Sequence, residues 1–118
     1  PNYDTQNVAL CEQELLAQKV EPSIIVDCSH GNSNKDYTRQ PIVAEDVINQ
    51  IIAGNKSIIG IMLESHLHAG NQSANLPKNE LAYGVSVTDA CIDFSTTEEL
   101  LVNTDVLLAS ILTERLSA

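Results

Sequence analysis

The stretch "SIIVDCSHGNSNKD", residues 23–36, sets an apolar run directly against a cluster of polar side chains. The run Ile24–Val26 is β-branched throughout, which is typical of a strand covered on both faces, as in parallel sheets. Pro22 precedes it as a helix breaker, and His30 follows it among residues that favour turns and caps. A buried strand that ends at a histidine favours an α/β fold with a site at the carboxyl end of the strand.

The same design recurs twice downstream. "KSIIGIMLESH", residues 56–66, is an apolar run that leads into Glu64, and "VSVTDACI", residues 85–92, predicts a shorter third strand that leads into Asp89. The intervening residues 66–84 have no sustained period and are rich in Asn, Gly and Pro, which predicts a long loop. Long loops of this kind are uncommon in compact domains unless they are functional.

Helical periodicity surrounds these strands. It predicts amphipathic helices over residues 5–18 and 42–54, the second preceded by the cap-type residues 32–34 and ended by Gly54. A terminal helix is expected from a capping box, formed either by Ser95 and Glu98 or by Thr96 and Glu99. Strands that alternate with helices in this order predict a parallel sheet with crossover connections.

Three parallel strands would leave two unpaired edges and an incompletely covered face. We therefore expect residues 1–118 to form one unit of a larger sheet or barrel, without a second domain. The sequence begins with Pro1 and shows no signal peptide, and it is expected to start partway through a longer protein.

Composition narrows the possible partners. The chain is 43% apolar, which suffices for a core, but only 3% aromatic with no Trp, which argues against a stacking platform for nucleic acid. Its 16 acidic and 6 basic residues give a formal charge of -10, so nucleic acids and anionic membranes are not expected partners. Three cysteines without C-x-x-C spacing fit a reducing cytoplasm.

Each expected strand delivers a metal-competent side chain at its carboxyl end: His30, Glu64 and Asp89. The ends of parallel strands meet at one edge of a sheet, so the three are expected to converge. A neutral imidazole with two carboxylates is a common ligand set for a catalytic divalent transition metal. The alternative is that these residues only mark strand ends that face water.

Several neighbours leave the same choice open. Asp27 either orients His30 or is an ordinary loop carboxylate. His66 is either an alternative ligand beside Glu64 or a loop histidine, and Cys91 either faces the site or is a structural thiol. Three residues after the first strand fit either capping or the binding of a substrate oxygen or phosphate: Asn32, Ser33 and Lys35.

Three segments carry a family resemblance: "DCSHGNSNKDYTRQP" at 27–41, "IIGIMLESHLHAGNQS" at 58–73 and "LAYGVSVTDACI" at 81–92. In this order they resemble the signature segments of the type I 3-deoxy-D-arabino-heptulosonate 7-phosphate (DAHP) synthases, of the microbial and fungal feedback-regulated kind. The resemblance extends from Pro1 to about Arg115. It implies that the chain is the C-terminal part of a (β/α)8 TIM barrel, about strands 6 to 8 with their helices. One departure is "CIDF" at 91–94, where relatives usually have Gly-Trp after the isoleucine.

The resemblance also implies a function. Family members are transferases of aromatic amino acid biosynthesis that condense phosphoenolpyruvate with erythrose 4-phosphate, the first step of the shikimate pathway. Their divalent metal ion (manganese, iron, cobalt or zinc) is held by a cysteine, a histidine, a glutamate and an aspartate. The last three match His30, Glu64 and Asp89, and Asp89 is also a candidate contact of the aldose phosphate.

The family cysteine, and nearly all the cations that grip the two phosphates, match no position here. An isolated chain of these residues is therefore expected to be inactive, and to require association with the missing barrel half or a homo-oligomer. The alternative to a working synthase segment is a catalytically inactive proteolytic or cloned fragment that persists by self-association of its exposed strand edges.

Overall fold

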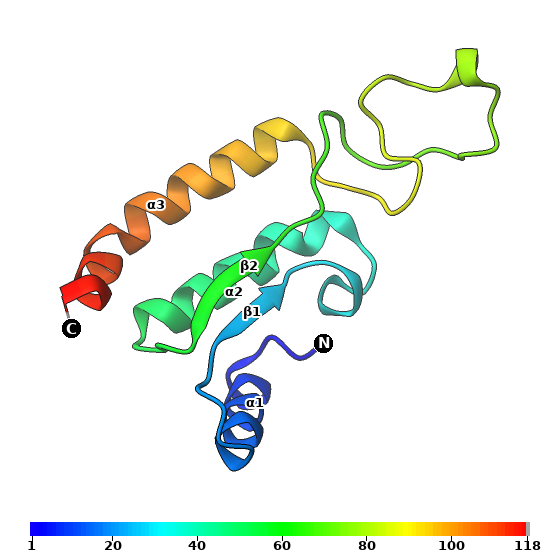
Figure 1. The fold of residues 1–118 in the computed structure, drawn as a ribbon. Helices are drawn as coiled ribbons and strands as arrows, with labels where there is room; N and C mark the ends of the chain where they lie inside the picture. The colour runs from blue at the N-terminus through cyan, green and yellow to red at the C-terminus, as the bar shows by residue number, and fades with distance from the viewer. Residues whose placement is uncertain (118) are drawn as a thin grey trace.

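The computed structural model describes residues 1–117, which form three α-helices and one two-stranded parallel sheet (Figure 1). The helices and strands are α1 (Thr5–Ala17), β1 (Ile24–Asp27), α2 (Gln40–Ile52), β2 (Ile58–Met62) and α3 (Phe94–Ser117). Three short 3-10 turns accompany them: η1 (His30–Ser33), η2 (Tyr37–Arg39) and η3 (Lys78–Glu80). The predicted α/β class is thus confirmed.

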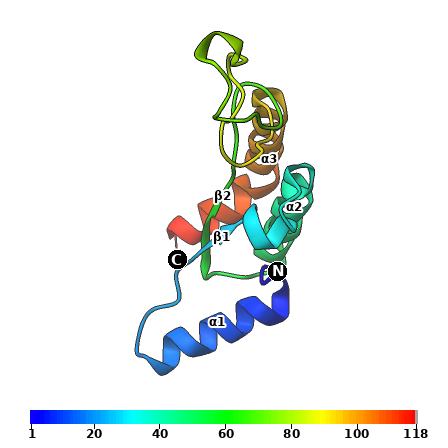
Figure 2. The same ribbon diagram turned by 90° about the vertical axis from the view of Figure 1, so that its right-hand side faces the viewer.

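The sheet is a β-α-β unit. Strand β1 pairs in parallel with β2, with Ile24 opposite Ile58 and Val26 opposite Ile61, and a register shift falls between Ile24 and Ile25. Helix α2 connects the two strands and lies against the sheet in both ribbon views (Figures 1 and 2). Because the strands run in parallel, the segments that follow them carry His30 and Glu64 to the same end of the sheet, at the carboxyl ends of the strands.

All three helices contribute to a single core. Val26 and Ile58 of the sheet pack with buried apolar residues of α2, and Val8 of α1 and Leu108 of α3 belong to the same cluster. The α2 members are Val43, Ala44, Val47, Ile48 and Ile51. Their spacing places them on one face of the helix, as the periodicity of residues 42–54 predicts.

One face of the strands is uncovered among the residues described here, as expected for part of a larger sheet or barrel. Ile25 is 65% exposed and Ile59 is 61% exposed, whereas Val26 and Ile58 are buried. The reason is that α1, α2 and α3 all pack into the one core on the Val26 side, and no element within residues 1–117 covers the other side.

The predicted third strand over residues 85–92 does not form. Three isolated bridges replace it, from Ser86 to Asn71, from Cys91 to Gly70 and from Ile92 to Ser65. Because the three contacts are made to separate positions and differ in direction, no ladder of consecutive pairs develops. Figure 1 shows the whole segment from β2 to α3 as a long excursion away from the sheet, with η3 as its helical turn.

Helix α3 begins earlier than the predicted capping boxes. Its first residue is Phe94, and Asp93 accepts a hydrogen bond from the backbone N–H of Thr96 at 2.8 Å. The Thr97 hydroxyl also donates to the Asp93 carbonyl at 2.9 Å. A carboxylate at this position satisfies an N–H group that has no partner within the helix, which is why the helix starts here.

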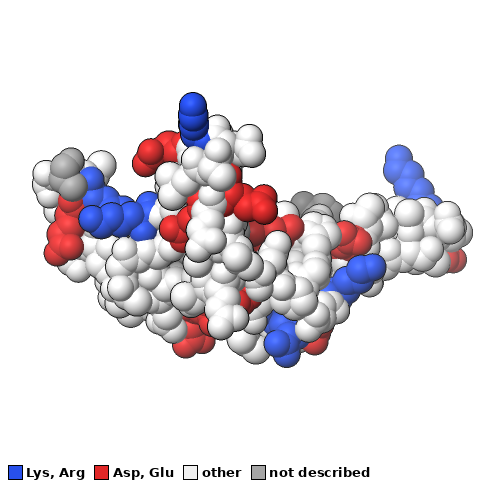
Figure 3. Space-filling view, turned by 90° about the horizontal axis from the view of Figure 1, so that it is seen from below, with Lys and Arg blue, Asp and Glu red and all other residues white. Residues whose placement is uncertain are grey.

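The surface is mixed in charge. Figure 3 shows Lys and Arg as separated groups on one face, with Asp and Glu spread among them. Within residues 1–117, no helix combines the length and the apolar character that crossing a membrane requires.

Candidate metal centre

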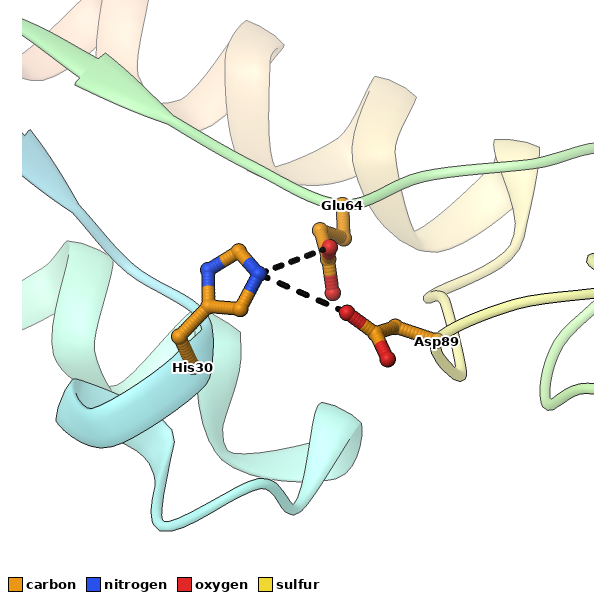
Figure 4. A group of neighbouring side chains, drawn as sticks. All are labelled: His30, Glu64 and Asp89. Carbon is orange, nitrogen blue, oxygen red and sulfur yellow. Dashed lines mark ion pairs between the residues drawn. The ribbon is translucent and has the colours of Figure 1, made fainter.

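Three side chains from distant parts of the chain meet at one point (Figure 4). His30 lies in η1 just after β1, Glu64 follows β2, and Asp89 lies in the loop that precedes α3. The His30 Nε2 atom is 3.2 Å from Glu64 Oε1 and 3.4 Å from Asp89 Oδ2. The structure therefore brings together the three residues predicted as ligands, and their ligand role stays a prediction.

The spacing of the donor atoms suits a metal ion. One ligand atom from each residue lies within 4.8 Å of those of the other two. Two ligands bound at about 2.0–2.2 Å to one ion are about 3–3.5 Å apart at the usual bond angles, close to the separations from His30 Nε2. The donor set, one imidazole nitrogen and two carboxylates, also fits a divalent transition metal. The donor set and the two separations from His30 Nε2 therefore fit such an ion.

The imidazole of His30 is held by hydrogen bonds at Nδ1, the nitrogen that faces away from Glu64 and Asp89. Its Nδ1 lies 2.8 Å from Asp27 Oδ2 and 2.8 Å from Ser29 Oγ, so Nε2 is the nitrogen that faces Glu64 and Asp89. The hydrogen bond to Asp27 raises the pKa of His30, and the charges of Glu64 and Asp27 add to this. Of the two interpretations of Asp27, the structure favours orientation of His30.

Asp27 itself is fixed as a carboxylate. Burial alone would raise its pKa, but hydrogen bonds from the hydroxyl and the backbone N–H of Ser29, at 2.7 and 2.8 Å, bring the pKa below its ordinary value. A charged acceptor on Nδ1 increases the basicity of Nε2. This arrangement favours either a protonated His30 paired with carboxylates or a cation in the place of that proton.

The loop that carries His30 has an unusual backbone. His30, Asn34 and Lys35 have φ values of 49°, 53° and 60°, in the left-handed region that residues other than Gly rarely adopt. The prediction that residues 32–34 start the next helix is therefore wrong: they belong to η1 and the turn after it, and α2 begins only at Gln40. Hydrogen bonds compensate this strain, including Lys35 N–H to the His30 carbonyl at 2.8 Å.

Asp89 is the most exposed of the three, with 67% of its side chain accessible. Its loop is anchored by Asn71, whose Nδ2 donates to the Thr88 carbonyl at 3.0 Å, and by backbone bonds in both directions between Gly70 and Cys91. The position of Asp89 is therefore fixed by contacts within its own loop and not by the sheet.

The other candidates take different places. His66 lies outside the group of three, and its Nδ1 accepts the N–H of Leu67, which fits a loop histidine. Cys91 is buried, its Sγ contacts the Asp89 carbonyl, and burial raises its pKa, which fits a structural thiol. Burial likewise raises the pKa of Cys28 to about 12.

Asn32 holds the loop together, because its Nδ2 donates to the Asp27 carbonyl at 2.8 Å and its Oδ1 accepts from the N–H of Asn2. Ser33 and Lys35 both line a hollow of about 220 Å³ around the three candidate ligands. Five further lining residues were not anticipated from the sequence: Ser29, Tyr37, Gln40, Asn71 and Ala90. For Gln40, the signal available in the sequence was its position next to Pro41, at the start of a helix with an apolar face.

Comparison with known proteins identifies the family of the chain. Residues 1–102 match the family described as "DAHP synthetase I family". The chain is 56% identical over 117 residues to "Phospho-2-dehydro-3-deoxyheptonate aldolase, Tyr-sensitive" of Enterobacter agglomerans, a match that covers 99% of this chain and 55% of the relative. It is 59% identical over 101 residues to the protein of the same name from Escherichia coli K12, covering 86% of this chain and 28% of that one.

A solved structure is also similar. "Structure of Phospho-2-dehydro-3-deoxyheptonate aldolase from Francisella tularensis SCHU S4" matches with a TM-score of 0.85 and 39% identity, over 92% of this chain and 31% of the other. The chain thus spans about half the length of the Enterobacter relative and less than a third of the other two. The chain belongs to the DAHP synthetase I family.

Proposed function

We propose that residues 1–118 form a single unit that contributes about strands 6 to 8, with their helices, to a (β/α)8 barrel in a longer synthase. The exposed apolar face of the sheet supports this proposal, because Ile25 and Ile59 would be covered by further strands and their side chains inside a closed barrel. The partial coverage of the Francisella chain, at a TM-score of 0.85, is consistent with it.

For the whole protein we propose the condensation of phosphoenolpyruvate with erythrose 4-phosphate, the first step of the shikimate pathway. Support comes from relatives at 56% and 59% identity whose names denote a phospho-2-dehydro-3-deoxyheptonate aldolase. We further propose a cytoplasmic protein, since its three cysteines are free.

We propose that His30, Glu64 and Asp89 hold the divalent ion, be it manganese, iron, cobalt or zinc. The observation that carries this proposal is the convergence of their ligand atoms, within 4.8 Å, from three separate segments. When bound, such an ion supplies Lewis-acid polarisation of a carbonyl oxygen. Asp27 keeps Nε2 of His30 directed at the centre, and the two carboxylates provide the negative charge that attracts the cation.

These residues alone are not proposed to be active. Two substrate phosphates require several fixed cations, and the chain has six Lys and Arg residues against sixteen acidic ones. The hollow of about 220 Å³ is also smaller than typical ligand pockets of ~300–1,000 Å³, as expected for one wall of a larger site. Activity then depends on the rest of the barrel, in one chain or by association, or on a homo-oligomer.

The test uses the full-length protein. His30→Ala, Glu64→Gln and Asp89→Asn are each expected to lower both bound metal, measured by elemental analysis after dialysis, and the rate of condensation. Asp105→Asn, which removes an exposed carboxylate from α3, serves as the matched control and should change neither quantity. Full metal content in the three site variants would overturn the metal centre. Loss of metal without loss of condensation would overturn its catalytic role.

A further inference from the structure

We propose that Gln40 is a positioning residue that sets the backbone of Glu64 for metal binding, an inference that rests on the proposed metal centre. Gln40 is the first residue of α2, and its side chain is 0% exposed. Glutamine is seldom buried so completely, and a buried amide must find hydrogen-bond partners.

Both partners of the Gln40 side chain belong to one residue. Its Nε2 donates to the Glu64 carbonyl at 3.0 Å, and its Oε1 accepts the Glu64 N–H at 2.8 Å. A side-chain amide that pairs with both backbone groups of one residue imitates a neighbouring strand. It does so where β1 has ended, since the Cys28 N–H to Met62 carbonyl bond is the last between the two strand segments.

The opposite side of Glu64 is also held. Its carbonyl accepts a second hydrogen bond, from the Ile92 N–H at 3.0 Å, and the His66 N–H donates to the Ile92 carbonyl at 2.9 Å. Ile92 lies three positions after Asp89. The Glu64 backbone is therefore fixed between helix α2, which follows the His30 loop, and the segment that carries Asp89.

This arrangement matters for metal binding because ligand positions must be held to within about 0.5 Å by surrounding groups. The Glu64 carboxylate has no hydrogen-bond partner among residues 1–117 other than its 3.2 Å ion pair with His30. Its position therefore depends on where its backbone lies, and Gln40 determines that on one side. If Gln40 only filled the core, its replacement would change stability and leave metal binding unaffected.

The test uses the full-length protein with Mn²⁺ and Co²⁺ as probes. Gln40→Met keeps the length of the side chain and removes both hydrogen bonds, while Gln40→Asn keeps an amide that is too short to reach both groups. The matched control is Gln50→Met on the same helix, because Gln50 Nε2 also donates to a distant backbone carbonyl, that of Tyr3, at 2.7 Å. Gln50 does not line the hollow around the centre.

We expect Gln40→Met to weaken Mn²⁺ binding about 10- to 100-fold, measured by electron paramagnetic resonance of free Mn²⁺, and to alter the visible spectrum of the Co²⁺-saturated protein. Gln50→Met should lower the urea midpoint yet leave Mn²⁺ affinity within about twofold and the Co²⁺ spectrum unchanged. If Gln40→Met does not fold, Gln40→Asn decides by the same two measurements.

The outcomes separate the two proposals. Failure of the unaltered protein to bind Mn²⁺ would remove the metal centre itself. Binding by the unaltered protein, with equal affinity and an equal spectrum in the Gln40 variants, would refute the positioning role and leave the centre intact. If neither Gln40 variant folds, Gln40 serves the fold and the specific role in metal binding is likewise refuted.

Discussion

Substitution of Gly84 by Ala tests how tightly the loop that carries Asp89 is packed. Gly84 has φ +74°, and a Cβ at this position would lie 2.9 Å from the Cβ of Leu67 and 3.0 Å from Cδ2 of His68. Gly70, in the same loop, has φ +89° but would place its Cβ in open space. The two positions therefore share the backbone strain and differ in the steric contact.

The magnitudes follow from these two terms. A left-handed backbone costs an L-residue about 1–2 kcal/mol, which is the whole expected loss for Gly70→Ala. Forced packing adds about 1–3 kcal/mol, so Gly84→Ala should lose about 2–5 kcal/mol. The contact cannot be relieved cheaply, because the Cβ of Leu67 moves only with its backbone and the His68 N–H is bonded to the Gly84 carbonyl at 2.8 Å.

The assay is urea unfolding of the full-length protein, combined with amide hydrogen exchange of residues 66–93 as a local measurement. Asn tolerates the left-handed region better than Ala does, so Gly70→Asn should recover part of the loss. Gly84→Asn should keep the steric part of the loss, since its Cβ meets the same atoms of Leu67. An equal cost for Gly70→Ala and Gly84→Ala would show that the steric reasoning is wrong.

Three further outcomes are expected. Asp27→Asn presents an N–H toward Nδ1 of His30 and should weaken Mn²⁺ binding about 10- to 100-fold, as equilibrium dialysis would show. Hydrogen bonds from Thr96 lower the pKa of Asp93, so its stabilisation of α3 is present above the ordinary carboxyl pKa of about 4 and is lost as pH falls through the lowered value. Asp93→Asn should remove that acid dependence, measured by amide exchange at Thr96. Arg115→Met removes hydrogen bonds to two backbone carbonyls at or just before the start of β2 and should cost about 1.5–3 kcal/mol in urea unfolding, with partial recovery in Arg115→Lys.

The parts of the fold that depend on local pattern could be predicted from the sequence. The apolar runs at 24–26 and 58–63 correspond to β1 and β2, and the periodic segment at 5–18 corresponds to α1 almost residue for residue. The meeting of His30 and Glu64 also followed from their positions after apolar runs, whereas Asp89 reaches the same point from a loop and not from the predicted third strand. These inferences succeed because strand and helix periods are properties of short windows.

What could not be predicted depends on pairing between distant residues. Residues 85–92 have the composition of a strand, but Gly70, Asn71 and Ser65 each take one isolated partner from them, so no ladder forms. The role of Gln40 was hidden for a similar reason, because it depends on which backbone groups are left unpaired after β1 ends.

The three candidate ligands are held in place by different contacts. Their positions should therefore differ in how strongly they respond to substitutions nearby. His30 is held by Asp27 and Ser29, which are its near neighbours in sequence, so its orientation is local. Glu64 depends on a tertiary contact from Gln40. Asp89 depends on a long loop and is the most exposed, so the loop substitution at Gly84 should displace it before the others. If the three are ligands as proposed, such a change should weaken metal binding while the contact between His30 and Asp27 persists, because that contact uses no residue of the loop.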